Sequence, residues 1–135
     1  SLRGEVPVGA ILVVEGKIAG WGRNDRMIKN NILGHAELIA IQRASENIQN
    51  WRLMRSTLYV TLEPCIMCTG ALLQSRVDRV VFGCRDAKMG AVRSLYALAE
   101  DPRLNHRIKI EEGVLADESS ALLRNFFENL HFGKF

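Results

Sequence analysis

The stretch TLYVTLEPCIMC, residues Thr57–Cys68, contains the change of secondary structure that decides the fold. Its first six residues, Thr57–Leu62, are mostly β-branched, aromatic or aliphatic and predict a central strand. Pro64 then opens a predicted helix from Cys65 to about Ser75, because proline in the first helical turn lacks only an N–H that would have no intrahelical partner. A buried strand that passes directly into a helix indicates an α/β fold.

The segments on either side continue this alternation. In chain order they predict a hairpin over Val8–Val14 and Lys17–Gly22, a loop over Asn24–Gly34, a helix over His35–Ala44, a strand over Arg79–Gly83, a short helix over Ser94–Glu100, a strand over Ile108–Ile110 and Val114–Leu115, and an amphipathic helix over Asp117–His131. This order predicts a sheet with helices on both faces. Because no linker or repeat interrupts it, we expect one domain over residues 1–135.

The composition is that of a globular protein, with 47% hydrophobic and 24% charged residues among 135. No apolar run approaches the roughly 20 residues that a membrane span needs, and Ser1–Ala10 lacks the pattern of a secretory signal. Three cysteines do not form a disulfide framework, which favours a reducing compartment. We therefore expect a cytoplasmic protein without a membrane partner.

The charge is unevenly distributed along the chain. Residues 76–109 carry eight Lys and Arg against four Asp and Glu, whereas residues 110–135 carry two against five. A basic middle segment permits a polyanionic partner such as a nucleic acid, but a charge excess of this kind is more often a solvated surface.

Two short motifs have the spacing of a metal site. Cys65 and Cys68 are three residues apart and share one face of the predicted helix, where the helix N-terminus favours thiolates. His35, at the start of the preceding helix, can reach them across the joining strand. Three such ligands leave the fourth position of a tetrahedral zinc site for water, as in catalytic zinc sites.

Glu37 lies two residues after this histidine, within the same helical turn. We expect it to take a proton from a zinc-activated water, to protonate a ring nitrogen and then the departing amine. The expected reaction is hydrolytic deamination of an amidine carbon, with release of ammonia.

Two other interpretations of the cysteines remain open at this stage. A C-x-x-C pair can be a redox motif, although the H-x-E motif thirty residues upstream argues against it. A structural zinc site would need a fourth protein ligand, which Cys84 or His106 could supply. We expect instead that Cys84 is a small buried or pocket residue and that His106 is an ordinary surface or packing residue.

The H-x-E and P-C-x-x-C motifs together resemble those of the bacterial tRNA adenosine deaminases, within the wider cytidine-deaminase fold. The resemblance extends over nearly the whole chain, through EVPVGAILV (Glu5–Val13), GWGRN (Gly20–Asn24), HAE (His35–Glu37), TLYVTLEPCIMC (Thr57–Cys68), SRVDRVVFG (Ser75–Gly83), RDAKMGAVRSL (Arg85–Leu95), NHR (Asn105–Arg107) and EGVLADESSALLRNFF (Glu112–Phe127). It implies a three-layer α-β-α fold with a five-stranded mixed sheet.

The resemblance also implies the site. One Zn²⁺ per subunit would be held by His35, Cys65 and Cys68, with Glu37 as the catalytic proton shuttle. The implied substrate-binding residues are Val8, Asn24, Ala36, Pro64, Asp86 and Lys88, with Asp86 and Lys88 along the RNA. The implied substrate is the wobble adenosine of a tRNA anticodon loop, which becomes inosine, and the implied assembly is a homodimer.

The sequence departs from the family pattern at three places. Only Ser1–Gly4 precede the first strand, where family members have an amphipathic helix. Ile32-Leu33-Gly34 replaces the usual D-P-T-A before His35, which would change the pocket entrance. Residues 128–135 carry one lysine in place of a basic tail, so we expect weaker RNA affinity.

Two alternatives to a tRNA adenosine deaminase remain open at this stage. A free nucleobase or nucleoside deaminase of the same fold, acting on guanine, cytosine or deoxycytidylate, would use the same zinc core behind a different entrance. A catalytically silent zinc module would bind RNA or a partner without turnover.

Overall fold

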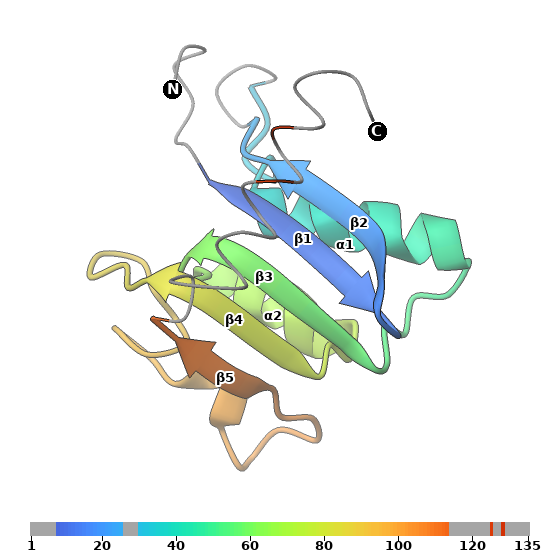
Figure 1. Ribbon diagram of the computed structural model, residues 1–135. Coiled ribbons are helices and arrows are strands. Elements are labelled where there is room, and N and C mark those ends of the chain that lie inside the picture. Colours follow the sequence, from blue (N-terminus) through green and yellow to red (C-terminus); the bar gives the residue numbers. More distant parts are fainter. Residues whose placement is uncertain (1–7, 26–29, 114–124, 126–127, 129–135) are drawn as a thin grey trace.

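The computed structural model describes residues 8–25 and 30–113, together with Asn125 and Glu128. Its described elements, labelled in Figure 1, are β1 (Gly9–Val14), β2 (Lys17–Arg23), α1 (Ala36–Ile48), β3 (Ser56–Leu62), α2 (Ile66–Gln74), β4 (Arg79–Cys84), a 3-10 turn (Leu98–Glu100) and β5 (Lys109–Glu112). The strands form one sheet in the order β2-β1-β3-β4-β5. β1 is antiparallel to β2 and β3, whereas β3, β4 and β5 run parallel. The predicted α/β fold with a five-stranded mixed sheet is confirmed.

The hairpin of β1 and β2 turns at Glu15 and Gly16, the two residues between its predicted strands. Glu15 and Gly16 have φ angles of 50° and 81°. Positive φ at both central positions is the geometry of a type I′ turn, whose twist matches that of the flanking strands.

Helix α1 packs unusually close to strand β2. The face of α1 that packs on β2 consists of the small residues Ala36, Ala40 and Ala44, all fully buried. They face Gly20 and Gly22, where a Cβ atom would lie 2.2 Å from the Ala40 carbonyl oxygen and 2.4 Å from that of Ala36, respectively. Because no side chain fits at either glycine, this contact fixes the position of the first turns of α1 against the sheet.

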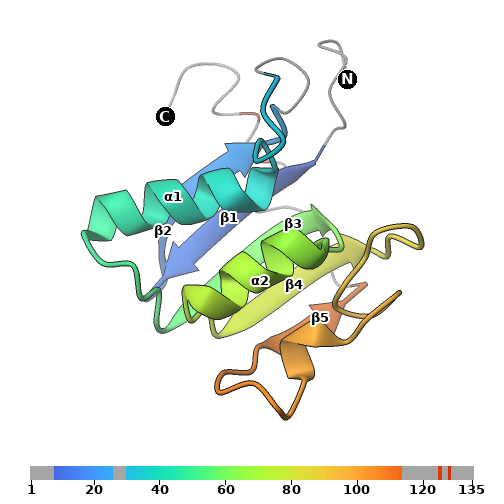
Figure 2. The same cartoon turned by 180° about the vertical axis from the view of Figure 1, so that it is seen from behind.

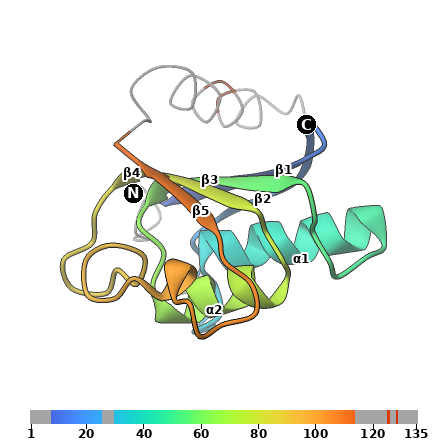
Figure 3. The ribbon, with the colours of Figure 1, turned by 90° about the horizontal axis from the view of Figure 1, so that it is seen from below.

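The segment β3-α2-β4 builds the centre of the molecule. Leu58 and Val60 of β3, Val80 and Phe82 of β4, and Leu72 of α2 are all fully buried. Helices α1 and α2 lie side by side on one face of the sheet (Figures 2 and 3). Parallel β3 and β4 end at the same edge, and the helix that follows β3 starts there. This edge therefore brings the first turns of both helices together.

One predicted helix is wrong over most of its length. The pattern of Ser94–Glu100 predicted a short helix, but only Leu98–Glu100 form a 3-10 turn. The reason is that the N–H of Leu98, which in a helix would bind the carbonyl of Ser94, donates instead to the carbonyl of Ala91 at 3.0 Å, and the N–H of Leu95 donates to that of Gly90 at 2.9 Å. The chain is thereby held in successive turns at the point where the helix would begin.

Two sequence predictions fall on residues that the structure does not describe. These are the strand residues Val114–Leu115 and nearly all of the helix predicted over Asp117–His131, of which Asn125 and Glu128 have helical backbone. The helix predicted to cover the second face of the sheet therefore falls outside the described residues. No helix within the described ranges is both long and apolar enough to cross a membrane.

Candidate metal centre and active site

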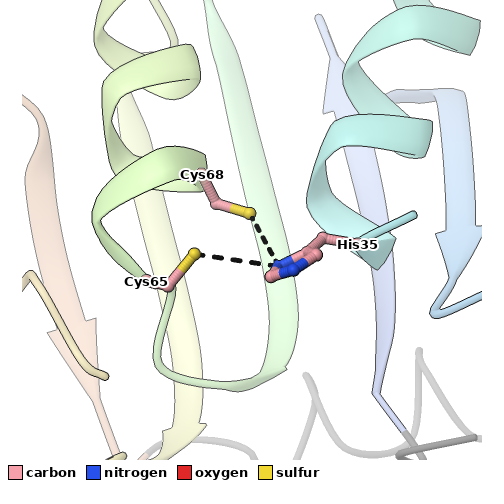
Figure 4. Close-up of side chains that lie close together, drawn as sticks. All are labelled: His35, Cys65 and Cys68. Carbon is pink, nitrogen blue, oxygen red and sulfur yellow. Dashed lines mark hydrogen bonds between the residues drawn. The ribbon is translucent and has the colours of Figure 1, made fainter. Parts of the chain in front are cut away.

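His35, Cys65 and Cys68 form a compact group at the start of the two helices (Figure 4). The distances from His35 Nδ1 are 3.7 Å to Cys65 Sγ and 3.5 Å to Cys68 Sγ. All three donor atoms lie within 4.8 Å of one another. The structure thus brings together the three residues predicted as metal ligands.

The backbone explains why these side chains meet. His35 is the N-cap residue of α1 and Cys65 that of α2, and both have extended backbone conformations. Neither side chain caps its own helix. In α1 the N–H of Ala36 is instead bound by Asn24, whose Oδ1 accepts it at 2.8 Å. Both ligand side chains are consequently available to face each other.

The donor set fits a tetrahedral zinc ion. With Zn–N and Zn–S lengths of about 2.05 and 2.3 Å, a tetrahedral angle separates the nitrogen and sulfur atoms by about 3.6 Å. The two observed N···S distances are 3.5 and 3.7 Å. One imidazole and two sulfur ligands are also the types that zinc prefers. The described residues therefore contain a group that could hold a metal ion with three protein ligands.

The two thiols differ in acidity. A hydrogen bond from the Cys68 thiol, the nearby N–H groups of Cys68 and Met67 and the charge of His35 together outweigh burial and lower the pKa of Cys65 to about 5. The hydrogen bond with Cys65, together with burial and the nearby Glu37 carboxylate, raises the pKa of Cys68. Cys65 is therefore the more acidic thiol of the pair, and the thiolate is the form in which cysteine binds a metal ion.

Glu37 is almost fully buried, with 4% of its surface exposed. Burial is the main cause that raises its pKa to about 7, and the negative charge of Cys65 adds to it. Its own backbone N–H and a hydrogen bond with Cys68 act in the opposite direction. A carboxyl group with a pKa near neutrality, next to a metal-binding group, has the acidity required of a general acid and base.

The residues predicted to contact the substrate lie at several places around this group. Val8 is buried in the core, and its carbonyl accepts the N–H of Asn24 at 3.2 Å. Pro64 is buried and its carbonyl accepts the N–H of Ala91 at 2.9 Å. Ala36 is fully buried and its N–H donates to Asn24. Their contacts with a substrate remain predictions.

Asp86 has a structural role that can be seen directly. Its Oδ1 accepts the N–H groups of Lys88 at 3.1 Å and Met89 at 3.2 Å. It thereby caps the turn that presents the exposed Lys88 side chain. RNA contact by Asp86 and Lys88 stays a prediction.

Neither residue considered as a fourth metal ligand joins the metal-binding group. His106 Nε2 lies 2.8 Å from the carbonyl of Val77. Cys84 donates to the carbonyl of Thr61 at 3.6 Å. The prediction that Cys84 is buried is wrong, because it ends the parallel strand β4 at an exposed position.

Much of the positive charge in residues 76–109 is neutralised within the fold. Four of its eight basic residues form ion pairs: Arg79 with Glu111 at 2.9 Å, and Arg85 with Glu112, Arg93 with Glu100 and Arg103 with Asp101, each at 2.7 Å. The basic segment is therefore weaker evidence for a polyanionic partner than its composition alone indicates.

Glu63 is a residue of the site region that the sequence analysis did not single out. It follows β3 directly and precedes Pro64 and Cys65, yet only 2% of its surface is exposed. Burial tends to raise the pKa of its carboxyl, but hydrogen bonds from Ser94, Arg93 and Asp86 outweigh that effect and lower it to about 2. The one signal in the sequence was an acidic residue between an apolar strand and the Pro-Cys turn.

Comparison with known proteins agrees with this site. A family model described as MafB19-like deaminase matches residues 2–131. The chain belongs to this deaminase family. It is therefore an enzyme that catalyses deamination, which is a hydrolytic reaction, and the metal-binding group with Glu37 lies where its motifs predicted.

Two relatives show the similarity of amino-acid sequence within the family. A tRNA-specific adenosine deaminase from Haemophilus influenzae is 48% identical over 126 residues, which are 93% of this chain and 73% of the relative. A second tRNA-specific adenosine deaminase, from Bacillus subtilis, is 44% identical over 128 residues, which are 95% of this chain and 80% of the relative.

Solved structures share the deaminase fold. A structure from a study of A-to-I editing by tRNA:A34 deaminases at the wobble position has a TM-score of 0.78 and 38% identity, covering 83% of this chain and 86% of the other. Guanine deaminase from Nitrosomonas europaea has a TM-score of 0.65 and 24% identity, covering 93% and 75%, and shows the fold alone. The predicted cytidine-deaminase-like fold is confirmed.

Proposed function

We propose that this deaminase converts adenosine to inosine at the wobble position of a tRNA anticodon loop. The observation that carries the proposal is the His35-Cys65-Cys68 group beside buried Glu37, in a chain whose relatives at 48% and 44% identity are tRNA-specific adenosine deaminases. A single-stranded loop suits such a buried site, because a loop base can leave its stack at small cost.

The ion would be one Zn²⁺ held by His35, Cys65 and Cys68. When bound, zinc lowers the pKa of a water molecule toward neutrality. Glu37 would accept one proton of that water and deliver it to a ring nitrogen of the adenine as the water oxygen adds to the carbon that carries the amine. It would then take the second proton from the added hydroxyl and deliver it to the amine, which leaves as ammonia as the C–N bond breaks and the C=O bond of inosine forms. Burial of Glu37 keeps solvent from competing for this proton.

The target nucleotide would be oriented by residues around this edge. Oδ1 of Asn24 is engaged by Ala36, so its amide NH₂ group is the part that can donate to the nucleotide. Val8, Ala36 and Pro64 would wall the base pocket. Lys88, exposed on the turn that Asp86 caps, would contact a phosphate.

We further propose a homodimer, and one cytoplasmic domain over residues 1–135. Four large apolar side chains, Ile66, Met89, Leu95 and Tyr96, are 53%, 56%, 53% and 58% exposed. The Cys65–Gly90 bridge and the hydrogen bond from Leu95 N to the Gly90 carbonyl hold their segments together. An apolar surface of this kind is suited to a second copy of the chain.

Light scattering after gel filtration tests the dimer. We expect a mass of twice 15.2 kDa for the wild type and of one chain for Leu95→Lys with Tyr96→Lys. Trp51→Lys, at a residue 57% exposed outside this surface, serves as the control and should remain dimeric. A monomeric wild type would contradict the proposal.

The substrate class is tested by comparing an anticodon stem-loop that carries adenosine at the wobble position with free guanine, cytosine, adenosine and deoxycytidylate. We expect inosine in the stem-loop and no turnover of the small substrates. Turnover of a free base or nucleotide without inosine in the RNA would overturn the proposal and favour a small-molecule deaminase. Ile32 and Leu33 stand in place of the usual family residues just before His35 and are 75% and 53% exposed. Because this change at the pocket entrance is what favours a small-molecule substrate, the comparison tests that alternative directly.

A further inference from the structure

The carboxylate of Glu63 accepts hydrogen bonds from the loop Arg85–Ser94, which follows β4. Its Oε1 accepts the N–H of Asp86 at 3.0 Å and the hydroxyl of Ser94. Its Oε2 accepts the N–H groups of Val92, Arg93 and Ser94 at 3.1, 2.7 and 2.9 Å. Five donors of a single loop thus converge on one carboxylate that is 2% exposed.

The loop also passes the carboxylate at very short range. A Cβ atom at Gly90 would lie 2.3 Å from Cδ of Glu63 and within 2.5 Å of both carboxylate oxygens. The neighbouring backbone is tied to the metal-site turn by the Cys65–Gly90 bridge and by a hydrogen bond from Ala91 to Pro64. The path of the loop beside Cys65 therefore depends on what occupies position 63.

Only an ionised carboxylate matches this arrangement. Its two oxygens offer about four lone-pair directions and no hydrogen, whereas a glutamine would place an NH₂ group against N–H groups. Donors left without an acceptor in a buried place would leave the loop destabilised. With its N–H groups turned toward Glu63 and Asp86, the loop exposes the basic side chains of Arg85 and Lys88 to solvent.

We infer that Glu63 is a positioning residue that shapes the Arg85–Ser94 loop into the surface on which the RNA lies beside the metal site. This inference rests on the proposed function for the identity of the partner. Glu63 acts through the loop backbone and takes no part in proton transfer. It therefore governs how the anticodon loop is held, while Glu37 governs the reaction.

The test compares Glu63→Gln with the wild type as zinc-loaded proteins acting on the anticodon stem-loop. We expect KM to rise about tenfold or more, since several hydrogen bonds to a charged group are lost, and kcat to change less than about threefold. Zinc content should be unchanged, and hydrogen exchange should become faster at the amides of Asp86 and Val92–Ser94. The control is Glu111→Gln, which removes a carboxylate that binds Arg79 on the adjacent strands and leaves the loop intact.

Two further variants keep the inference testable. Gly90→Ala retains the charge but displaces the loop, and we expect the same rise in KM and faster exchange. Ser94→Ala removes a single donor from Glu63, so it should fold even if Glu63→Gln does not, with KM raised about threefold.

The outcomes separate the two proposals. An active wild type with unchanged KM in Glu63→Gln and Gly90→Ala, or a loss confined to kcat or zinc content, would overturn the positioning role alone. A wild type without activity on the stem-loop would contradict the proposed function and with it the RNA-facing role of the loop.

Discussion

Glu37 and Glu63 are both buried carboxylates near the metal-binding group, with 4% and 2% of their surface exposed, but their environments are opposite. Burial raises the pKa of Glu37 to about 7, because few donors compensate for it. Around Glu63 burial acts in the same direction, yet donors from Ser94, Arg93 and Asp86 lower its pKa to about 2. Desolvation thus dominates at Glu37 and favours a group that can exchange protons, whereas the hydrogen-bond donors around Glu63 dominate there and favour a group that stays ionised.

The largest effect should come from removing the ion that Glu37 would serve. We expect Cys65→Ala to lose zinc and all measurable deaminase activity and to lower thermal stability, because the site joins the starts of α1 and α2. Cys84→Ala is the matched control, since that cysteine is exposed and outside the group, and it should retain all three properties. Metal analysis that finds full zinc occupancy in Cys65→Ala would refute the ligand assignment.

Helix α1, which carries Glu37, can be displaced by a substitution in strand β2. Gly22→Ala places a Cβ atom 2.4 Å from the Ala36 carbonyl oxygen, so α1 must move away from β2. We expect a loss of about 2 kcal/mol or more in unfolding free energy and weaker zinc binding, measured by denaturant titration and metal competition.

Gly70→Ala supplies the contrast for that experiment. Gly70 lies within α2, and apart from its chain neighbours and the helix's own backbone no atom of the described residues is within 4 Å of a Cβ placed there. Alanine favours a helix over glycine by about 1 kcal/mol, so this variant should be as stable as the wild type or more so. Equal losses in both variants would mean that the close packing of α1 on β2 has no special role.

The contribution of Glu63 to the free energy of unfolding should depend on pH. The folded pKa of Glu63, about 2, lies below the ordinary value of 4.5, so its ionised form adds stability that is fully present above about pH 4.5 and is lost as the pH falls toward 2. We expect Glu63→Gln to be about 2 kcal/mol less stable than the wild type at pH 7, and this difference to shrink below about pH 4.5 to roughly a quarter of its full size near pH 2.5.

Comparing the two proteins at each pH removes the effect of acid on the metal site, which they share. Urea unfolding at a series of pH values measures the difference. A difference that does not change with pH would contradict the ionised state of Glu63.

Much of this molecule was predictable because its signals are local. The hairpin turn at Glu15-Gly16, the strand Thr57–Leu62 and the helix after Pro64 each follow from a few neighbouring residues, and the structure has them at nearly those bounds. The convergence of His35 with the two cysteines followed from two motifs at helix starts.

The features that were missed depend on contacts between distant segments. The helix expected over Ser94–Glu100 does not form because the N–H of Leu98 donates to the carbonyl of Ala91 and not to that of Ser94. Glu63 is buried because it binds the backbone of a loop some thirty residues later, which no local pattern indicates. Ion pairs such as that of Arg85 with Glu112 likewise neutralise part of the positive charge of residues 76–109, and composition alone does not show this pairing.

Inosine formation in an anticodon stem-loop with adenosine at the wobble position, compared between the wild type and Glu37→Ala, tests the central claim most directly. We predict inosine with the wild type, and a rate about a thousandfold lower or undetectable with Glu37→Ala while zinc content and folding are retained, as expected for loss of a general acid and base. Equal inosine formation by both proteins, or none by a zinc-loaded wild type, would contradict the account.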